Sequence, residues 1–292
     1  MKALSVQERS LSSFDGTKLA YHVVGKGLPV LLANGLGGSW LAWKHQIGHL
    51  LDRYRFISWD YRGLYRSARP ADLASLTIEH HARDGLAVLE AEGIERTAIW
   101  GWSMGVQVAL EMVRHWPRSV AALVLLNGVA GKPWRSVLNT SALEMFVPKV
   151  LRSVRAIHPL AEAVTKRVVQ WPETMGWAKR LGLASGTLDE ALFQELAASF
   201  ADIDMDVYMR ILESLGEHDA EDVLAEIRVP TLVVAGDRDL FTPRRMAERM
   251  VRRIAGAELL VVPGGTHYVA VEYPELVSLR IEKFFRERGY AE

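Results

Sequence analysis

The sequence contains no cysteine among its 292 residues. Disulfides, thiolate metal sites and a cysteine nucleophile are therefore excluded. The chain also lacks an excess of either charge, because 35 lysines and arginines balance 35 aspartates and glutamates. Nucleic-acid-binding domains usually carry a basic excess, so we expect no nucleic-acid partner. Composition does not predict the oligomeric state.

Long apolar runs are missing as well. The most apolar segment, residues 120–131 (VAALVLLNGVAG), is too short to span a bilayer and is interrupted by Asn127 and Gly128. Charged residues are scattered through the first twenty positions, where a signal peptide would need an apolar core. We therefore expect no signal peptide, no transmembrane segment and a cytoplasmic protein.

Hydrophobic residues make up 49% of the chain, which is ample material for a core. Short apolar runs that end in Gly, Asp or Asn alternate with segments of helical periodicity, which is typical of an α/β protein with a parallel sheet covered on both faces. The predicted strands are 18–25, 29–34, 55–60, 97–101, 120–127, 231–236 and 257–264. The predicted helices are 40–52, 77–92, 104–116, 243–254 and 273–287.

Residues 128–226 interrupt this alternation. They show helical patterning, several prolines and no convincing strand, so we expect a helical insertion between two parts of an α/β core, 1–127 and 227–292. Such an insertion can form a lid over a pocket, although most of its aromatic residues are expected simply to pack it against itself and the sheet. These aromatic residues include Trp134, Phe146, Trp171, Trp177, Phe193 and Phe200.

The pentapeptide GWSMG, residues 101–105, joins a predicted strand to a predicted helix. Glycines at 101 and 105 allow strand and helix to approach while Ser103 adopts a strained turn at the carboxyl end of the sheet. The pattern predicts a nucleophilic serine. A simple helix N-cap would explain the serine but not both glycines.

A nucleophilic serine needs a base, and the base needs a carboxylate. Among the nine histidines, His267 follows the last predicted strand and a Gly-Gly turn, so it is the best placed to meet Ser103. Asp237 and Asp239 both follow the strand 231–236. We favour Asp239 as the acid because it stands three residues after Gly236 and four before Pro243, which opens the next predicted helix, whereas Asp237 is nearer the strand end and is placed to brace the turn. The chain order Ser103, Asp239, His267 is that of a nucleophile-elbow enzyme.

Two patterns resemble metal-binding motifs, but each lacks a residue that its motif requires. His45 and His49 share a helix face, yet no glutamate follows His45 and no third ligand is evident. Residues 202–213 place acids as a calcium loop does, but Val207 stands where that loop needs glycine. An acidic start to a helix explains the second pattern better. We expect neither metal nor cofactor.

Taken together, LLANGLGG, DYRGLYRS, GWSMG, AGDRDLFTP and GGTHYVAVEYPE resemble the motifs of the α/β-hydrolase superfamily over nearly the whole chain. The resemblance implies an eight-stranded, mostly parallel sheet with a helical lid. It implies Ser103 as nucleophile, Asp239 as acid and His267 as base. It also implies an oxyanion hole made by the backbone N–H groups of Leu36 and Met104.

The sequence departs from its relatives at two positions. Many relatives have His-Gly where this chain has Asn34-Gly35, and glycine where it has Tyr65. We expect Asn34 to keep the oxyanion loop in place, while Tyr65 either lines the entrance or lies on the surface. Haloalkane dehalogenases and epoxide hydrolases of the superfamily use an aspartate nucleophile, so Ser103 argues against both.

These features predict a serine hydrolase that cleaves a carboxylic ester, a lactone or a similar small acyl compound through an acyl-enzyme. Trp40, Trp102 and Tyr268 are candidates for the pocket wall, the last two because each adjoins a predicted catalytic residue. The same triad also serves perhydrolases, acyltransferases and C–C bond hydrolases of the superfamily. A ligand-binding protein without turnover is a further alternative.

Overall fold

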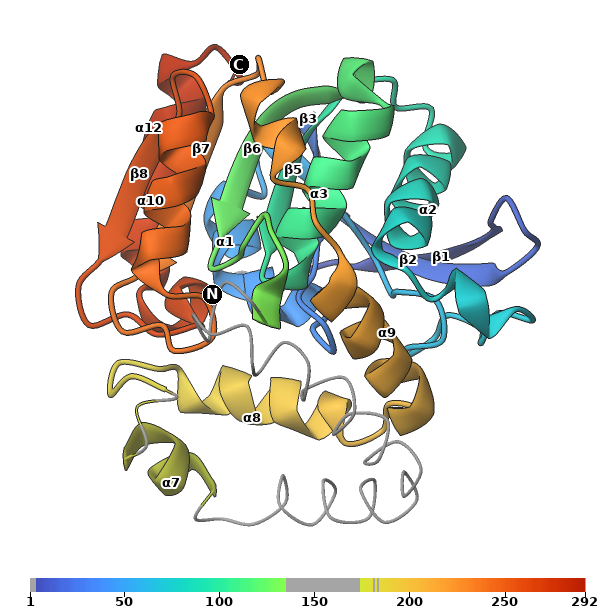
Figure 1. The fold of residues 1–292 in the computed structure, drawn as a ribbon, viewed down its shortest axis with the longest axis horizontal. Coiled ribbons are helices and arrows are strands. Elements are labelled where there is room, and N and C mark those ends of the chain that lie inside the picture. The colour runs from blue at the N-terminus through green and yellow to red at the C-terminus, as the bar shows by residue number, and fades with distance from the viewer. Residues whose placement is uncertain (1–3, 135–173, 181, 183, 292) are drawn as a thin grey trace.

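The computed structural model describes residues 4–134, 174–180, 182 and 184–291 (Figure 1). Its centre is an eight-stranded sheet in the order β1-β2-β4-β3-β5-β6-β7-β8. The β1–β2 and β2–β4 pairs are antiparallel, and the remaining pairs are parallel. The strands are β1 (Gln7–Ser12), β2 (Lys18–Gly25), β3 (Leu28–Ala33), β4 (Tyr54–Trp59), β5 (Thr97–Trp102), β6 (Val120–Leu126), β7 (Thr231–Gly236) and β8 (Glu258–Val262).

Two helical layers cover this sheet because its parallel strands are apolar on both faces. One layer contains α2 (Ile78–Ala91), α3 (Met104–His115) and α10 (Arg244–Arg253). The other contains α1 (Lys44–Leu50), the short α11 (Val269–Glu272) and α12 (Pro274–Glu287). Successive strand residues alternate between the layers; for example, Leu31 faces the first and Leu32 the second.

The predicted elements agree closely with these boundaries, with three exceptions. The edge strand β1 was not predicted, because its sequence, QERSLS, is polar and almost entirely exposed. The four-residue α11 lies between the predicted elements 257–264 and 273–287 and is not predicted either. The predicted helix 40–52 is divided into a 3-10 turn, η1 (Trp40–Trp43), and α1.

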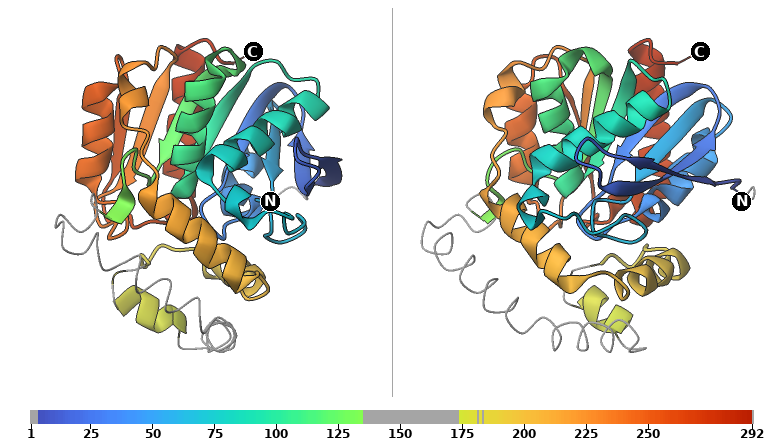
Figure 2. Two further views of the ribbon diagram at one scale, coloured as in Figure 1. Left: turned by 45° about the vertical axis from the view of Figure 1, so that its right-hand side comes forward. Right: turned by 90° about the vertical axis from the view of Figure 1, so that its right-hand side faces the viewer.

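The described part of the insertion is helical and lies beyond the carboxyl ends of the parallel strands, as the three views show (Figures 1 and 2). It contains α7 (Thr174–Arg180), α8 (Glu190–Phe200), α9 (Met205–Glu217) and the 3-10 turn η4 (Asp222–Ala225). Phe146 and Trp171 lie outside the described residues. No described helix has both the length and the apolar character needed to cross a membrane.

The acidic segment at 202–213 begins a helix, as expected. Asp204 is the N-cap of α9, and its carboxylate accepts a hydrogen bond from the Val207 N–H at 3.1 Å. Its side chain also pairs with Arg69. These contacts are those of a capped helix start and not of a calcium loop.

Candidate active site

Ser103 occupies a strained turn between β5 and α3. Its backbone has φ 56° and ψ −117°, a conformation that non-glycine residues rarely adopt. Both flanking glycines are required for space. A Cβ on Gly101 would lie 2.4 Å from the Gly105 carbonyl oxygen, and a Cβ on Gly105 would lie 1.9 Å from that of Ala33. The turn therefore exists because side chains are absent at both positions.

His267 connects this turn to a carboxylate. It lies between β8 and α11, and its Nε2 is 2.9 Å from Ser103 Oγ. Its Nδ1 is 2.9 Å from Oδ2 of Asp239. His267 and Asp239 are 7% and 4% exposed, so the hydrogen bond between them is shielded from water. The structure thus brings together the three residues predicted from distant motifs.

Asp239 lies in the loop between β7 and α10, surrounded by donors. Besides His267, the carboxylate accepts hydrogen bonds from the backbone N–H groups of Phe241 and Thr242, the Thr242 hydroxyl and the side-chain amide of Asn127. Burial alone would raise the pKa of Asp239, but the neighbouring His267 and these hydrogen bonds outweigh it and hold the pKa below 3.8. The group is therefore ionised at neutral pH.

Asp237, the alternative acid, has a different partner. Its Oδ1 accepts a hydrogen bond from the Gly264 N–H at 2.7 Å. This contact braces the turn that precedes His267, the role expected for Asp237 if it were not the acid.

Two supporting residues were not predicted. Asn127 follows β6 with φ 43°, and its amide donates to Asp239 Oδ2 at 2.7 Å and to the Thr266 carbonyl at 3.1 Å. The buried Glu272 carboxylate accepts from the Thr266 N–H and hydroxyl and from the Ser185 N–H of the insertion. These contacts fix the residue that precedes His267. In the sequence, Asn127 is marked only as a polar residue at the end of an apolar strand. Many loop residues share that feature, so it does not identify Asn127 as a partner of Asp239.

The predicted oxyanion groups border Ser103. Gly35 packs so tightly against the turn that a Cβ there would lie 3.2 Å from Ser103 Cβ. Within the part of the chain that the structure describes, neither the Leu36 N–H nor the Met104 N–H donates a hydrogen bond. Neither N–H group therefore has an acceptor among the described residues.

Asn34 anchors the loop that carries Leu36. Its side-chain amide donates to the Ser58 hydroxyl at 2.9 Å, and its Oδ1 accepts from the Trp43 indole N–H at 3.0 Å. Because this side chain is buried and bonded on both sides, the asparagine keeps the loop in place, as expected.

The three candidate wall residues divide into two groups. Trp102 donates its indole N–H to the His267 carbonyl at 3.0 Å, and the Trp102 and Tyr268 rings each lie 5.8 Å from the His267 ring. Trp40 instead lies against His22 of β2, with ring centroids 6.2 Å apart. Trp102 and Tyr268 therefore border the triad, whereas the ring contact of Trp40 is with a strand of the sheet.

The paired histidines of α1 diverge. His45 binds Asp189 of the insertion, and His49 binds Glu282 of α12. Among the residues described, no group of three or more His, Cys, Asp or Glu side chains is arranged to hold a metal.

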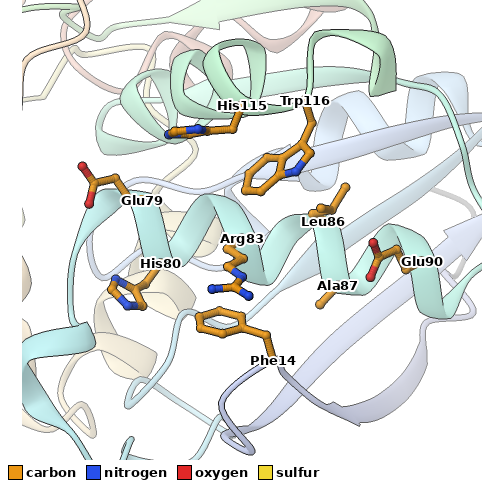
Figure 3. Close-up of a pocket in the computed structure, with 9 residues that line it drawn as sticks. All are labelled: Phe14, Glu79, His80, Arg83, Leu86, Ala87, Glu90, His115 and Trp116. Atoms are coloured by element: carbon orange, nitrogen blue, oxygen red, sulfur yellow. The ribbon is translucent and has the colours of Figure 1, made fainter.

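Away from Ser103, a hollow lies on the outer face of α2 and α3 (Figure 3). The Arg83 guanidinium covers the Phe14 ring there, 3.7 Å from its centroid, and His80 and His115 are among the lining residues (Figure 3). Its lining residues include no serine, threonine or other activated nucleophile. The hollow therefore has no hydroxyl nucleophile comparable to Ser103 among its lining residues.

An eight-stranded, mostly parallel sheet with a serine at a strand-to-helix turn, hydrogen-bonded to a buried His and Asp, defines an α/β hydrolase. Residues 29–274 match the family model for the alpha/beta hydrolase fold. The chain belongs to this family.

Curated relatives extend over most of the chain. "Putative carbamate hydrolase RutD" of Azorhizobium caulinodans is 28% identical over 276 residues, which cover 89% of this chain and 92% of that protein. The protein of the same name from Variovorax paradoxus is 30% identical, covering 85% and 89%. A thermophilic esterase from Thermogutta terrifontis has a similar structure, with a TM-score of 0.76, 24% identity and coverage of 96% and 98%. The family and the curated relatives support hydrolytic chemistry, and the likeness to the solved structure supports the fold.

Proposed function

We propose that this protein is a serine hydrolase that cleaves a carboxylic ester or a similar acyl compound through an acyl-enzyme. The observation that carries the proposal is the chain of two 2.9 Å hydrogen bonds from Asp239 through His267 to Ser103 Oγ. A nucleophile, a base and an orienting carboxylate in this arrangement are the parts that acyl transfer requires.

The reaction begins when His267 Nε2 takes the Ser103 proton and Oγ attacks the substrate carbonyl. The ionised Asp239 stabilises the imidazolium that forms. The Leu36 and Met104 N–H groups receive the oxyanion, and the loss of one such donor typically costs about 3–4 kcal/mol of transition-state stabilisation. His267 then protonates the leaving alcohol, and water releases the acid by the same route.

Residues 128–226 act in this proposal as a lid. The Phe193 ring of α8 packs edge-to-face on Tyr268 at 5.1 Å, so the insertion and the residue after His267 share an apolar contact. An uncharged acyl group suits such surroundings. Trp102 and Tyr268 form part of its wall.

Carbamate hydrolysis is a second candidate, because two relatives that cover most of the chain carry that name. A carbamate carbonyl is attacked by the same serine and needs the same oxyanion hole. A panel of p-nitrophenyl esters, lactones and carbamates, ranked by kcat/KM, separates the two candidates.

The decisive test is Ser103→Ala. We expect kcat for p-nitrophenyl butyrate to fall by about 10⁴-fold or more, with an unchanged circular dichroism spectrum. A fluorophosphonate should label the wild type at Ser103 and leave the variant unlabelled. Ser119→Ala is the control, because Ser119 precedes β6 at the opposite end of the sheet and donates to the Trp116 carbonyl. A Ser103→Ala enzyme that retained near-native kcat would refute the proposal.

The same assays address the other functions of this triad. Steady multiple turnover argues against a ligand-binding protein, whereas a single slow acylation supports one. Perhydrolysis, acyl transfer and C–C cleavage are measured directly with hydrogen peroxide, an alcohol acceptor or a vinylogous diketone.

A further inference from the structure

Tyr65 is in an unusual position for a tyrosine. It lies in the loop after β4 with φ 52°, a left-handed conformation that costs a β-carbon-bearing residue about 1 kcal/mol or more. Its side chain is largely enclosed, and its hydroxyl donates a hydrogen bond to the Gly37 carbonyl. It is therefore neither a surface aromatic nor a free wall residue.

This hydrogen bond begins a chain that ends at a predicted oxyanion donor. The Gly37 carbonyl belongs to the same peptide group as the Gly38 N–H, which donates to the Gly35 carbonyl at 2.9 Å. That carbonyl in turn belongs to the same peptide group as the Leu36 N–H. Peptide groups are planar, so fixing the Gly37 carbonyl orients both groups. Hydrogen bonds in such a chain also polarise one another.

The loop that carries Tyr65 is rigid enough to position it. The Ser67 hydroxyl donates to the Asp60 carbonyl at 2.6 Å, and the Gly63 N–H donates to the Ala68 carbonyl at 2.9 Å. A second tyrosine of the loop, Tyr61, donates to the Asn34 carbonyl at 2.7 Å. The turn at 34–38 is thus held by two hydroxyls from one loop.

The insertion closes the turn from the other side. A Cβ on Gly37 would lie 2.5 Å from the Phe200 ring of α8 and 3.1 Å from the Tyr208 ring of α9. These two rings pack edge-to-face at 5.2 Å.

Burial raises the pKa of Tyr65 far above 10, so its hydroxyl keeps its proton and remains a donor over the whole working range of pH.

We infer that Tyr65 is a positioning residue for the oxyanion hole: its hydroxyl orients and polarises the Leu36 N–H through the peptide groups 37–38 and 35–36. This inference rests on the proposed function. It assigns to Tyr65 a contribution to kcat, because the oxyanion contact forms fully only in the transition state.

The test is Tyr65→Phe, which keeps the ring and removes only the hydroxyl. We expect kcat for p-nitrophenyl butyrate to fall by about tenfold, less than for the loss of a whole donor, while KM changes by less than about twofold. Rates are expressed per active site, titrated with a fluorophosphonate, so that a smaller folded fraction does not imitate the effect. Tyr54→Phe is the matched control, since the Tyr54 hydroxyl also donates to a backbone carbonyl, that of Tyr290, from the amino end of β4.

A transition-state analogue gives a readout that a purely structural role would not move. A trifluoromethyl ketone forms a tetrahedral adduct whose oxyanion occupies the hole, so its inhibition constant should rise in Tyr65→Phe in parallel with the fall in kcat. Unchanged kcat and inhibition constant, or a change in KM alone, would overturn the inference while leaving the hydrolase intact. A wild type that neither turned over esters nor reacted with the fluorophosphonate at Ser103 would overturn the proposed function, and the inference with it.

Discussion

The ionisation of the buried Asp60 carboxyl should make the stability of the folded protein depend on pH. Asp60 is the first residue after β4 and is only 4% exposed. Its Oδ2 accepts one backbone hydrogen bond, from Arg66 at 3.3 Å. Burial raises the pKa of Asp60 to about 7, and the Arg66 N–H offsets this only in part. Asp60→Asn removes the charge and retains an acceptor of the same shape.

The sign follows from proton linkage. The carboxyl of the unfolded chain ionises near 3.8 and that of the folded protein near 7, so the folded state is progressively penalised as the pH rises from about 4 to about 7. The full difference of about 3 pKa units sets an upper limit of about 4 kcal/mol. His22 Nδ1 is 4.0 Å from Asp60 but does not compensate, because burial lowers the pKa of His22 and keeps the imidazole neutral in the upper part of this range.

We therefore expect the free energy of unfolding of Asp60→Asn to exceed that of the wild type by about 1–3 kcal/mol at pH 8. At pH 4 the variant and the wild type should have nearly the same free energy of unfolding. Urea unfolding followed by tryptophan fluorescence, at intervals across this range, measures the difference. Asp222→Asn is the control, because the hydrogen bond from Arg114 lowers the pKa of this exposed carboxyl and its neutralisation should bring no gain at pH 8. The reasoning would be refuted if Asp60→Asn were no more stable than the wild type at pH 8, or if its gain in stability were the same at pH 4 as at pH 8.

Two further predictions concern the acid and the core. Thr242→Val removes the hydroxyl that donates to Asp239 at 2.6 Å; we expect kcat/KM for p-nitrophenyl butyrate to fall by about 3- to 30-fold with a melting temperature close to that of the wild type, and an unchanged kcat/KM would contradict the support assigned to this hydroxyl. Asp84→Asn leaves the fully buried Arg62 without its main carboxylate partner; we expect a loss of about 3 kcal/mol or more in urea unfolding, and a loss below about 1 kcal/mol would show that Asp15 alone balances the guanidinium.

Much of the site could be predicted because its key residues belong to short motifs with local physical causes. Ser103 is recognisable since a strained turn between a strand and a helix needs small neighbours on both sides, and GWSMG supplies them. His267 and Asp239 are recognisable because each follows an apolar strand, and parallel strands end at the same edge of a sheet. The close match of predicted and observed boundaries has the same origin, since apolar runs and helical periodicity report burial directly.

The supporting residues could not be predicted in this way. Asn127 is 112 positions from Asp239, and no periodicity connects them. No motif marks Glu272, and the sequence does not indicate that Thr266 and Ser185 donate hydrogen bonds to its carboxylate. The edge strand β1 is exposed and polar, so it forms only because β2 offers unpaired backbone groups. The place of Trp40 against His22 likewise depends on packing between β2 and η1.

The amino-acid sequence by itself determined the class of fold and the turn at Ser103, and it indicated His267 and either Asp237 or Asp239 as the distant partners, because each depends on local spacing and on the side chain's own chemistry. Only the tertiary structure decided that Asp239 and not Asp237 faces His267, that Asn127 and Glu272 hold the site, and that the Tyr65 hydroxyl reaches Gly37. Those assignments depend on the directions of hydrogen bonds between segments far apart along the chain, and directions of this kind exist only once the sheet has brought the segments together.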